Sequence, residues 1–261
     1  MKFTVSSRQT AEYLRKANVI KVQWRDRKII PDLAEKYPEA TINLTRYYMD
    51  CDSAIDWNEL NNYKILTREK LMLGLSLPQE LNEARQMAFK HYYLSPVRTF
   101  EELCDLKEAG VCCVYLAAPL FFQLDKVKEF GIPVHAVVNV ANASSLFSRN
   151  DGVVGTWIRP EDVDTYDNYI DVIEFAGDIT QEQALYRIYA EKKAWSGELG
   201  LLVKDLNYIA TNRMIPPTLA ETRISCGQKC KMNGKCKLCY RILDLANPDK
   251  IRHYLNDFHD S

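Results

Sequence analysis

Short runs of β-branched and aromatic residues recur along the first two thirds of the chain. Successive runs begin 17 to 29 residues apart, and helical patterns or turn residues separate most of them. Near-continuous apolar strands that alternate with helices are typical of a parallel sheet buried on both faces. Eight such units in a chain of this length predict an α/β fold, a (β/α)8 barrel of the TIM type. The eight runs are residues 19–24, 41–48, 70–75, 91–94, 111–116, 133–140, 153–158 and 170–175.

A ninth run, at residues 3–5, makes the strand count ambiguous. A predicted helix follows it, beginning at Ser7, a residue type that favours helix starts. Either this run belongs to the barrel and one of the eight does not, or it covers the barrel floor. An open doubly wound sheet is the structural alternative, although that fold rarely needs eight parallel strands.

One predicted helix, between the fourth and fifth runs, has clear signals at both ends. Thr99 is a favoured N-cap residue, and Glu102 stands where its capping-box partner belongs. Gly110 is placed to end the helix, since glycine readily adopts the left-handed backbone of helix C-termini.

Four cysteines lie close together near the C-terminus: Cys226, Cys230, Cys236 and Cys239. Gaps of three, five and two residues allow their four thiolates to meet at one point. Thiolates are preferred ligands of tetrahedral zinc and of iron–sulfur clusters, and the surrounding lysines would offset their charge. The spacing predicts a metal site that holds zinc, with an iron–sulfur cluster as the alternative. Four ordinary thiols or two disulfides are the remaining interpretation.

The four-cysteine window lies outside the repeating pattern. A long amphipathic helix is predicted over residues 180–195, and Pro216 and Pro217 mark a linker before the window. We therefore expect residues 1–195 to form the barrel. Residues 196–261 should form a C-terminal helical extension that carries the four-cysteine metal site.

The composition is that of a globular protein without strong charge bias. Hydrophobic residues make up 47% of the chain and charged residues 26%, with a formal net charge of −1. This balance argues against a globally basic nucleic-acid-binding protein, although the lysines of the cysteine window form a local basic patch. The first residues lack the apolar core of a signal peptide, and no apolar run is long enough to cross a membrane. We expect a cytoplasmic protein with no membrane partner.

In barrels of this type, active sites lie at the carboxyl ends of the strands. Arginines placed there suit carboxylate or phosphate groups, and so predict an anionic substrate or a nucleic acid. Nearby carboxylates could act as general acids or bases, or could only form salt bridges at the rim. The predicted substrate-binding residues are Arg25, Arg46, Arg98 and Asn139, and the predicted catalytic residues are Arg159, Glu161 and Glu174.

Several familiar catalytic signatures are absent from the sequence. It contains no Gly-rich phosphate loop, no His-Glu-x-x-His and no Gly-x-Ser-x-Gly, so hydrolysis by a barrel-bound zinc or by a serine triad is not indicated. His91 and His135 lie at predicted strand starts, the face of a barrel associated with stability, and are expected to be structural. Cys112 and Cys113 lie in an apolar run and are expected to fill the core.

Segments around the later predicted strands share a familiar pattern. They are residues 155–162 (GTWIRPED), 169–174 (YIDVIE), 99–103, 107–115 and 130–139. Together, across residues 95–180, they resemble the collagenase-like peptidase family. The resemblance implies a barrel, cysteine ligands for an iron–sulfur cluster and, in several members, hydroxylation of RNA bases or of quinone precursors. In that family the ligand cysteines are spread along the chain, whereas here all four lie in one window, so the ligands are not carried over residue by residue.

Three functions remain open at this point. The first is a metal-binding barrel enzyme that acts on an anionic or nucleic-acid substrate, with RNA modification or hydroxylation implied by the resemblance. The second is a non-catalytic, zinc-stabilised protein that binds nucleic acid or supports an assembly. The third is a peptidase-like hydrolase, for which the sequence offers neither an activated nucleophile nor a hydrolytic metal site.

Overall fold

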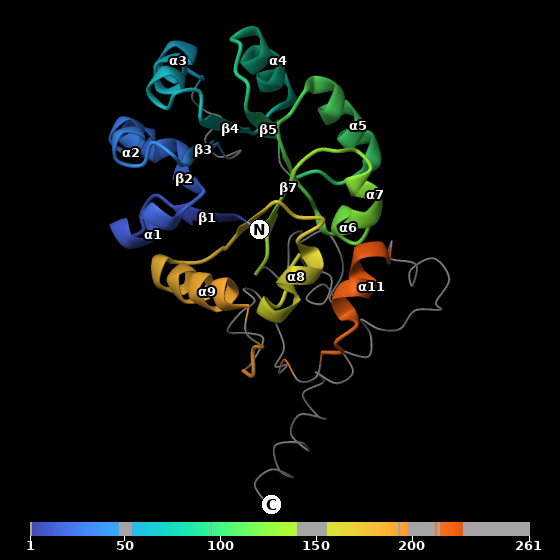
Figure 1. Cartoon of the computed structure of the whole chain (residues 1–261). Helices are drawn as coiled ribbons and strands as arrows, with labels where there is room; N and C mark the ends of the chain where they lie inside the picture. The colour runs from blue at the N-terminus through green and yellow to red at the C-terminus, as the bar shows by residue number, and fades with distance from the viewer. Residues whose placement is uncertain are drawn as a thin grey trace, which may run out of the picture. The chain divides into compact units, whose positions relative to one another are not determined.

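The chain folds around eight parallel strands in a nearly closed barrel with helices between them, consistent with a TIM-type α/β barrel (Figure 1). The computed structural model describes residues 2–46, 54–94, 96–139, 156–192, 194–197, 212 and 215–226. The predicted barrel is therefore confirmed, while most of the predicted C-terminal extension lies outside the described residues. The strands are β1 (Lys2–Ser6), β2 (Val19–Gln23), β3 (Thr41–Thr45), β4 (Leu71–Leu75), β5 (Tyr92–Leu94), β6 (Val114–Tyr115), β7 (Val134–Val137) and β8 (Val172–Glu174).

The sheet order is β5-β4-β3-β2-β1-β8-β7-β6, so β5 and β6 stand at its two ends. Backbone hydrogen bonds join these ends. The N–H of Cys112 donates to the carbonyl of Tyr92 at 3.0 Å, and the N–H of Val97 donates to that of Tyr115 at 2.8 Å. A parallel bridge between Val97 and Leu116 extends the contact. These bonds bring the sheet close to full closure, as a barrel requires.

The chain divides into two compact units. The first comprises Met1–Leu116, Val127–Ala136 and Ile170–Glu174, and the second comprises Ala117–Lys126, Val137–Tyr169 and Phe175–Ser261. Every strand belongs to the first unit, except that the last residue of β7, Val137, belongs to the second.

The ambiguity in the strand count resolves in favour of the N-terminal run. Residues 3–5 belong to β1, which pairs with both β2 and β8. The run at residues 153–158 was wrongly predicted to be a barrel strand, because its described residues, 156–158, form none. They cap the end of β7 instead: the Thr156 hydroxyl donates to the carbonyl of Val137 at 2.7 Å, and the N–H of Ile158 donates to that of Val138 at 2.9 Å.

Helices follow most of the strands. The predicted helix after Thr99 begins and ends as expected: the Thr99 side chain accepts from the N–H of Glu102, the Glu102 carboxylate binds the N–H of Thr99, and Gly110 has a φ of 75°. The helices are α1 (Ala11–Lys16), η1 (Trp24–Ile29), α2 (Ile30–Lys36), α3 (Trp57–Leu66), α4 (Pro78–Gln86), α5 (Phe100–Ala109), α6 (Ala118–Phe121), α7 (Leu124–Lys128), η4 (Pro160–Asp162), α8 (Val163–Tyr166), α9 (Ile179–Glu191) and α11 (Leu219–Ser225).

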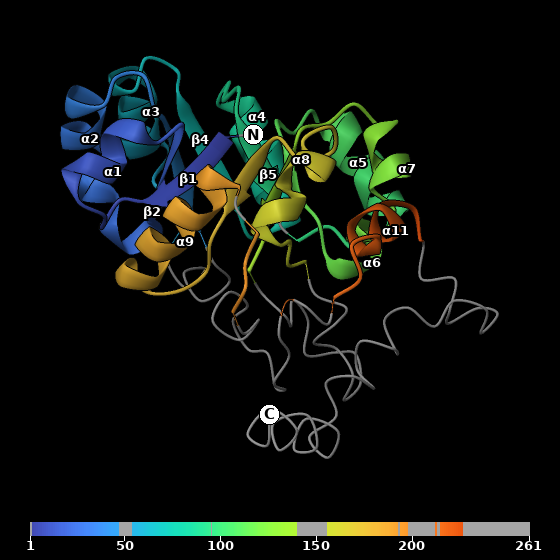
Figure 2. The same cartoon turned by 60° about the horizontal axis from the view of Figure 1, so that its bottom comes forward.

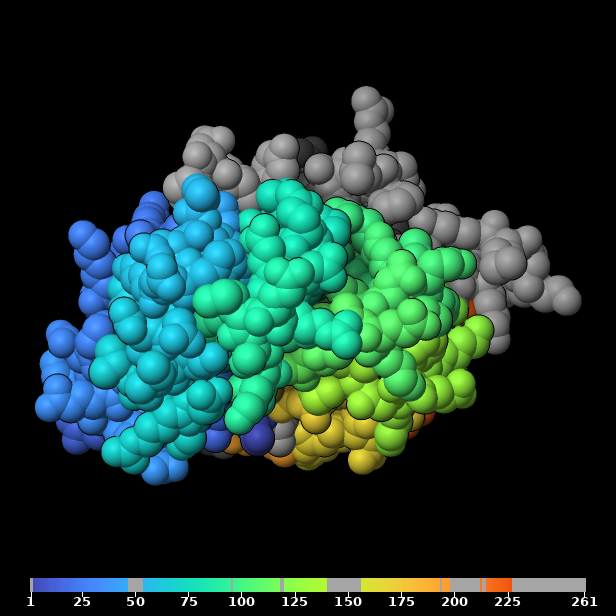
Figure 3. Space-filling view, turned by 90° about the horizontal axis from the view of Figure 1, so that it is seen from above, coloured from blue at the N-terminus to red at the C-terminus, as the bar shows by residue number. Residues whose placement is uncertain are grey.

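In the first unit, helices α1 to α5 lie outside strands β1 to β5 (Figures 1 and 2). Figure 3 looks onto the outer surface that α3, α4 and α5 form side by side. Beneath the helices, strand residues such as Val5, Ile20, Ile42 and Leu73 are at most 1% exposed. Burying each such side chain contributes roughly 1.5–3 kcal/mol, so this layer between strands and helices is the main apolar core.

Among the described residues, no helix combines the length and apolar character needed to cross a membrane.

Candidate active site

Polar residues occupy alternate positions of the first three strands, with the exception of Val19 at the start of β2. Lys2, Thr4 and Ser6 alternate with apolar residues in β1, Lys21 follows the same rule in β2, and Asn43 in β3. The strand register aligns Ser6 with Lys21 and Lys21 with Asn43. Because successive side chains of a strand point to opposite faces, the polar ones share one face. The apolar ones face the helices, so the polar face is the interior of the barrel.

Contacts that cross intervening strands confirm this orientation. The Lys21 ammonium on β2 forms an ion pair with the Glu174 carboxylate on β8, across β1. The Tyr115 hydroxyl on β6 donates to Glu174 Oε2 at 3.1 Å, across β7. Glu174 and Tyr115 are the last residues of their strands, which places the group near the carboxyl ends of the strands. This is the end of such barrels where catalysis takes place.

A second set of interior contacts lies around Tyr93 on β5. Its hydroxyl donates to Asn43 Oδ1 at 3.1 Å and lies 3.4 Å from Thr45 Oγ1, both on β3. Gly74 on β4 makes this reach possible, because a Cβ at that position would lie only 2.5 Å from the Tyr93 hydroxyl oxygen. The glycine is thus required by a close approach between side chain and backbone.

Aromatic contacts join the two sets. The rings of Tyr93 and Tyr115 have centroids 5.0 Å apart, and the His135 ring meets that of Tyr115 edge-on at 5.4 Å. We call these seven residues the interior network: Lys21, Asn43, Thr45, Tyr93, Tyr115, His135 and Glu174. Six of the seven are buried, while the Lys21 side chain is 23% exposed and brings the network towards solvent.

Burial sets the protonation of the uncharged members. It lowers the pKa of His135 to about 4, against the opposing effect of Glu174 and Asp171, so the imidazole is neutral at pH 7. Burial and the nearby Glu174 carboxylate raise the pKa of Tyr115 well above its ordinary value. The phenol therefore stays protonated and serves as a hydrogen-bond donor to Glu174.

Three buried polar atoms on the inward faces have no hydrogen-bond partner among the described residues: Thr4 Oγ1, Asn43 Nδ2 and His135 Nδ1. An unpaired buried polar group costs about 1–3 kcal/mol. Buried groups of this kind are rare in native proteins and call for an explanation such as water, an ion or a catalytic role. Together with Glu174 and Lys21 they give the interior donors, acceptors and a carboxylate, the groups needed to bind a polar molecule and transfer a proton.

The predicted substrate-binding residue Arg46 follows β3 and forms an ion pair and a cation–π contact within the protein. Its Nη1 lies 2.6 Å from Glu80 Oε1, and its guanidinium lies 5.2 Å from the centre of the Trp24 ring. Glu80 in turn accepts from the N–H groups of Ser76 and Leu77, at the start of α4. The Arg46–Glu80 pair therefore anchors the first turn of α4 to the end of β3.

Arg25 and Arg98, also predicted to bind substrate, have exposed side chains on η1 and just before α5. The structure does not bring Arg25, Arg46 or Arg98 into contact with Glu174 in any interaction of the described residues.

Three other predicted residues belong to the second unit. Arg159 forms a bidentate ion pair with Asp162, in which Nε lies 2.5 Å from Oδ2 and Nη2 lies 2.8 Å from Oδ1. Its Nη1 lies 3.7 Å from Glu161, which also accepts from Asn212. Burial raises the pKa of Asp162, and the hydrogen bond from Arg159 opposes that change. Asn139 binds the backbone of Ala176 through both its amide oxygen and nitrogen, each at 2.7 Å.

Of the predicted metal ligands, only Cys226 is described. It is half-buried at the C-cap of α11. Arg223, one turn earlier, fixes that helix: its Nη1 donates to the carbonyl of Trp157 at 2.5 Å, and its guanidinium lies 4.9 Å from the Phe122 ring centre. Cys230, Cys236 and Cys239 lie outside the described residues. Within the part of the chain that the structure covers, no group of three or more His, Cys, Asp or Glu side chains is arranged to hold a metal ion.

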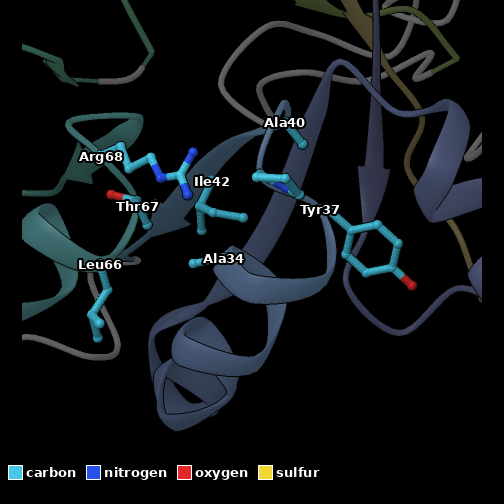
Figure 4. Close-up of a pocket in the computed structure, with 8 residues that line it drawn as sticks. Ala34, Tyr37, Ala40, Ile42, Leu66, Thr67 and Arg68 are labelled. Atoms are coloured by element: carbon cyan, nitrogen blue, oxygen red, sulfur yellow. The ribbon is translucent and has the colours of Figure 1, made fainter.

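A shallow hollow lies on the outer surface of the first unit, between α2, β3 and the end of α3 (Figure 4). Its wall includes Ala34, Ile42 and Leu66, and Arg68 extends over it. It contains no carboxylate, histidine or cysteine, so it offers no acid–base or metal-binding group.

Sequence reasoning selected Glu174 but missed the other members of the interior network. The signal was present in the alternation of β1, β2 and β3, whose polar positions recur with a period of two. A parallel sheet buried on both faces ordinarily reads as a continuous apolar run. Alternation in strands that must lie in such a sheet therefore indicates a polar interior.

No known protein-family profile matches this chain, and no curated protein matches its sequence.

Proposed function

We propose that the chain is an enzyme whose reaction takes place at the carboxyl end of the barrel, around Glu174. The observation that carries the proposal is the interior network, which replaces the branched apolar side chains that ordinarily fill a TIM barrel. A buried ion pair often contributes less to stability than apolar residues of similar size. Polar and charged groups in the place of apolar core residues depart from the rules of stable folding, and such departures concentrate at functional sites.

Glu174 is the proposed general base, since its carboxylate is the acceptor at the centre of the network. Lys21 forms an ion pair with that carboxylate and, being partly exposed, would also attract an anionic substrate. Tyr115 would orient the carboxylate through its hydrogen bond and act as a positioning residue. The neutral His135 offers a nitrogen without a partner as a further hydrogen-bonding group for the substrate.

We propose that the substrate is anionic and, more specifically, that it is a nucleic acid. Arg25 and Arg98 are exposed and available for phosphate contacts, and lysines surround the four cysteines. The similarity of residues 95–180 to the collagenase-like peptidase family supports RNA-base modification of the hydroxylation type.

Cys226, Cys230, Cys236 and Cys239 are the proposed ligands of a metal centre. A set of four thiolates fits both structural zinc and an iron–sulfur cluster. A cluster would supply electrons for a hydroxylation, whereas four-coordinate zinc would only stabilise the segment that follows α11. Free cysteines elsewhere in the described chain agree with a reducing, cytoplasmic setting.

Nucleoside analysis tests the proposal. Total RNA from cells that express the wild-type chain is digested and compared by mass spectrometry with RNA from cells expressing Glu174→Gln. The exposed Glu12→Gln on α1 is the matched control for loss of a carboxylate. We expect a nucleoside heavier by one oxygen atom with the wild type and the control, and its absence with Glu174→Gln. Identical nucleosides in all three samples would contradict RNA hydroxylation.

A non-catalytic nucleic-acid-binding protein is the second candidate. It is favoured by one observation: Arg46 and Arg159, predicted to meet an anion, are already paired with Glu80 and Asp162. Such a protein would bind total RNA with an affinity that falls with salt, because phosphate contacts release counterions. Arg25→Gln and Arg98→Gln would each reduce the salt dependence, whereas Glu174→Gln would leave binding unchanged and no modified nucleoside would form.

A further inference from the structure

Two adjacent cysteines and a histidine meet at the amino ends of β5 and β6. His91 directly precedes β5, and Cys112 and Cys113 directly precede β6. The backbone hydrogen bond from Cys112 to Tyr92, 3.0 Å long, holds these two strand starts together. The cluster is therefore built into the seam that closes the barrel, at the opposite end of the strands from Glu174.

The sulfur atoms of this cluster are in contact. The Sγ atoms of Cys112 and Cys113 lie 3.9 Å apart, within hydrogen-bonding range for sulfur. Cys113 Sγ also lies 3.8 Å from Met72 Sδ. The His91 imidazole also interacts electrostatically with the Cys112 side chain. Cys113 is 1% exposed, whereas Cys112 is only half-buried, so Cys112 is the more solvent-exposed residue of the pair.

The surroundings favour a thiolate on Cys112. The hydrogen bond with Cys113 lowers the pKa of Cys112 to about 6; burial opposes this change and the neighbouring His91 assists it. Burial and the charge of Cys112 raise the pKa of Cys113 well above its ordinary value. The interaction with Cys112 raises the pKa of His91. The cluster thus places a sulfur that favours the thiolate beside a sulfur that favours the protonated form and an imidazole whose pKa is raised.

The other charged groups near the cluster come from three connecting segments, before β4, before β5 and before β8. Lys90 and Glu69 act on His91 with opposite signs, and their side chains are 3.9 Å apart. Asp171, just before β8, acts on Cys113 and favours its protonated form. The thiolate is the reactive form of cysteine towards oxidants and electrophiles, and a solvent-accessible thiolate beside a resolving cysteine is the usual arrangement of a redox-sensitive site.

We infer that Cys112 is a modification site for hydrogen peroxide, with Cys113 as its resolving cysteine. The Cys112 thiolate attacks one oxygen of the peroxide, an S–O bond forms, the O–O bond breaks, and hydroxide leaves and takes a proton from solvent to become water. The Cys113 sulfur then attacks the Cys112 sulfur, an S–S bond forms, and the Cys113 proton leaves with the hydroxyl as water. The cysteine pair loses two electrons, which the peroxide gains as it becomes two molecules of water.

The product would be readily reduced again. Cα atoms of adjacent residues are about 3.8 Å apart, below the 4.4–6.8 Å range of ordinary disulfides, so a bond between Cys112 and Cys113 is strained. Strained disulfides have more oxidising potentials and are the labile ones.

The first test needs no variant. Each cysteine of the wild-type chain is alkylated with iodoacetamide from pH 5 to pH 9, and the rates are resolved by peptide mass spectrometry. We expect the rate at Cys112 to reach half its maximum near pH 6 and then to level off. An ordinary thiol, with a pKa of about 8.5, keeps rising over this range. Cys104 on α5, which is exposed, is the internal comparison. A Cys112 rate that rises to pH 9 without levelling would overturn the proposal.

The second test uses hydrogen peroxide at pH 7. In the wild type, the peptide that contains Cys112 and Cys113 should lose two hydrogens and regain them with dithiothreitol. Cys113→Ser should instead trap a sulfenic acid on Cys112, detectable with dimedone, and Cys112→Ser should show neither product. Oxidation of Cys104 while Cys112 and Cys113 remain reduced would contradict the proposal, as would dimedone labelling of Cys113 in Cys112→Ser at the wild-type rate.

Discussion

Two ion pairs, one in each unit, each contain one residue that the sequence predicted to be catalytic, Arg159 in the first pair and Glu174 in the second pair, and they differ in how they are built. Arg159 and Asp162 are three residues apart, share a short segment and meet through two parallel hydrogen bonds. Lys21 and Glu174 are 153 residues apart and meet only because the barrel forms, next to polar atoms that have no partner among the described residues. We call Arg159–Asp162 the closed pair, because its two groups satisfy each other within one short segment. We call Lys21–Glu174 the open pair, because polar atoms without a partner lie beside it, and this makes it the better candidate for catalysis.

The largest expected effect comes from breaking the closed pair. Arg159→Met leaves the Asp162 carboxylate buried without its cation, and removing one partner of a buried pair costs about 3–5 kcal/mol. Urea unfolding followed by circular dichroism measures the loss. Lys16→Met, which breaks the exposed pair with Glu12, is the control and should change little. A loss no greater than that of the control would show that the pair does not hold its unit together.

His135 should make the interior network sensitive to acid. Its pKa is lowered in the fold from 6.5 to about 4, so the unfolded chain binds more protons between these values. Stability is then complete above pH 6.5 and is lost as the pH falls towards 4, by roughly 3 kcal/mol, since each pH unit is worth about 1.4 kcal/mol. Unfolding free energies measured from pH 7.5 to 4 should fall more steeply for the wild type than for His135→Gln. Equal slopes would contradict the assignment of a buried, neutral imidazole.

A somewhat smaller effect is expected at Gly74. An alanine there places a methyl group 2.5 Å from the Tyr93 hydroxyl oxygen, and overpacking of this kind costs about 1–3 kcal/mol. Tyr93→Leu shortens the opposing side chain, so the double variant Gly74→Ala with Tyr93→Leu should lose less stability than the two single variants added together. Strict additivity in the double-mutant cycle would mean that the two residues do not meet inside the barrel.

The parts of the fold that could be predicted from sequence are those with local causes. Thr99, Glu102 and Gly110 act within a few residues of each other, and the helix between them begins and ends as predicted. The run at residues 153–158 has strand-like composition, yet Thr156 and Ile158 donate hydrogen bonds to the end of β7, and the Trp157 carbonyl accepts from Arg223 on α11. Composition alone does not distinguish a barrel strand from an extended segment that caps one.

The candidate site was predictable only in part. The rule that barrels react at the carboxyl ends of strands selected Glu174, and the alternation in β1 to β3 could have selected Lys21 and Asn43. No local signal links Glu174 to Tyr115, which lies 59 residues away in sequence. The rule also selected Arg46 and Arg159, whose carboxylate partners, Glu80 and Asp162, could be recognised only from the fold.

The smallest expected change in stability is also the most direct test of the central claim that the open pair serves function rather than folding. The triple variant Lys21→Met, Glu174→Leu and Tyr115→Phe replaces the pair by apolar side chains of similar size and also removes the Tyr115 hydroxyl, which would otherwise lose its acceptor. Such replacements are often neutral, or stabilise by 1–4 kcal/mol. The measurement is the free energy of unfolding in urea at pH 7. We expect a value equal to or above that of the wild type; a loss of more than about 2 kcal/mol would show instead that the pair is required for the fold itself.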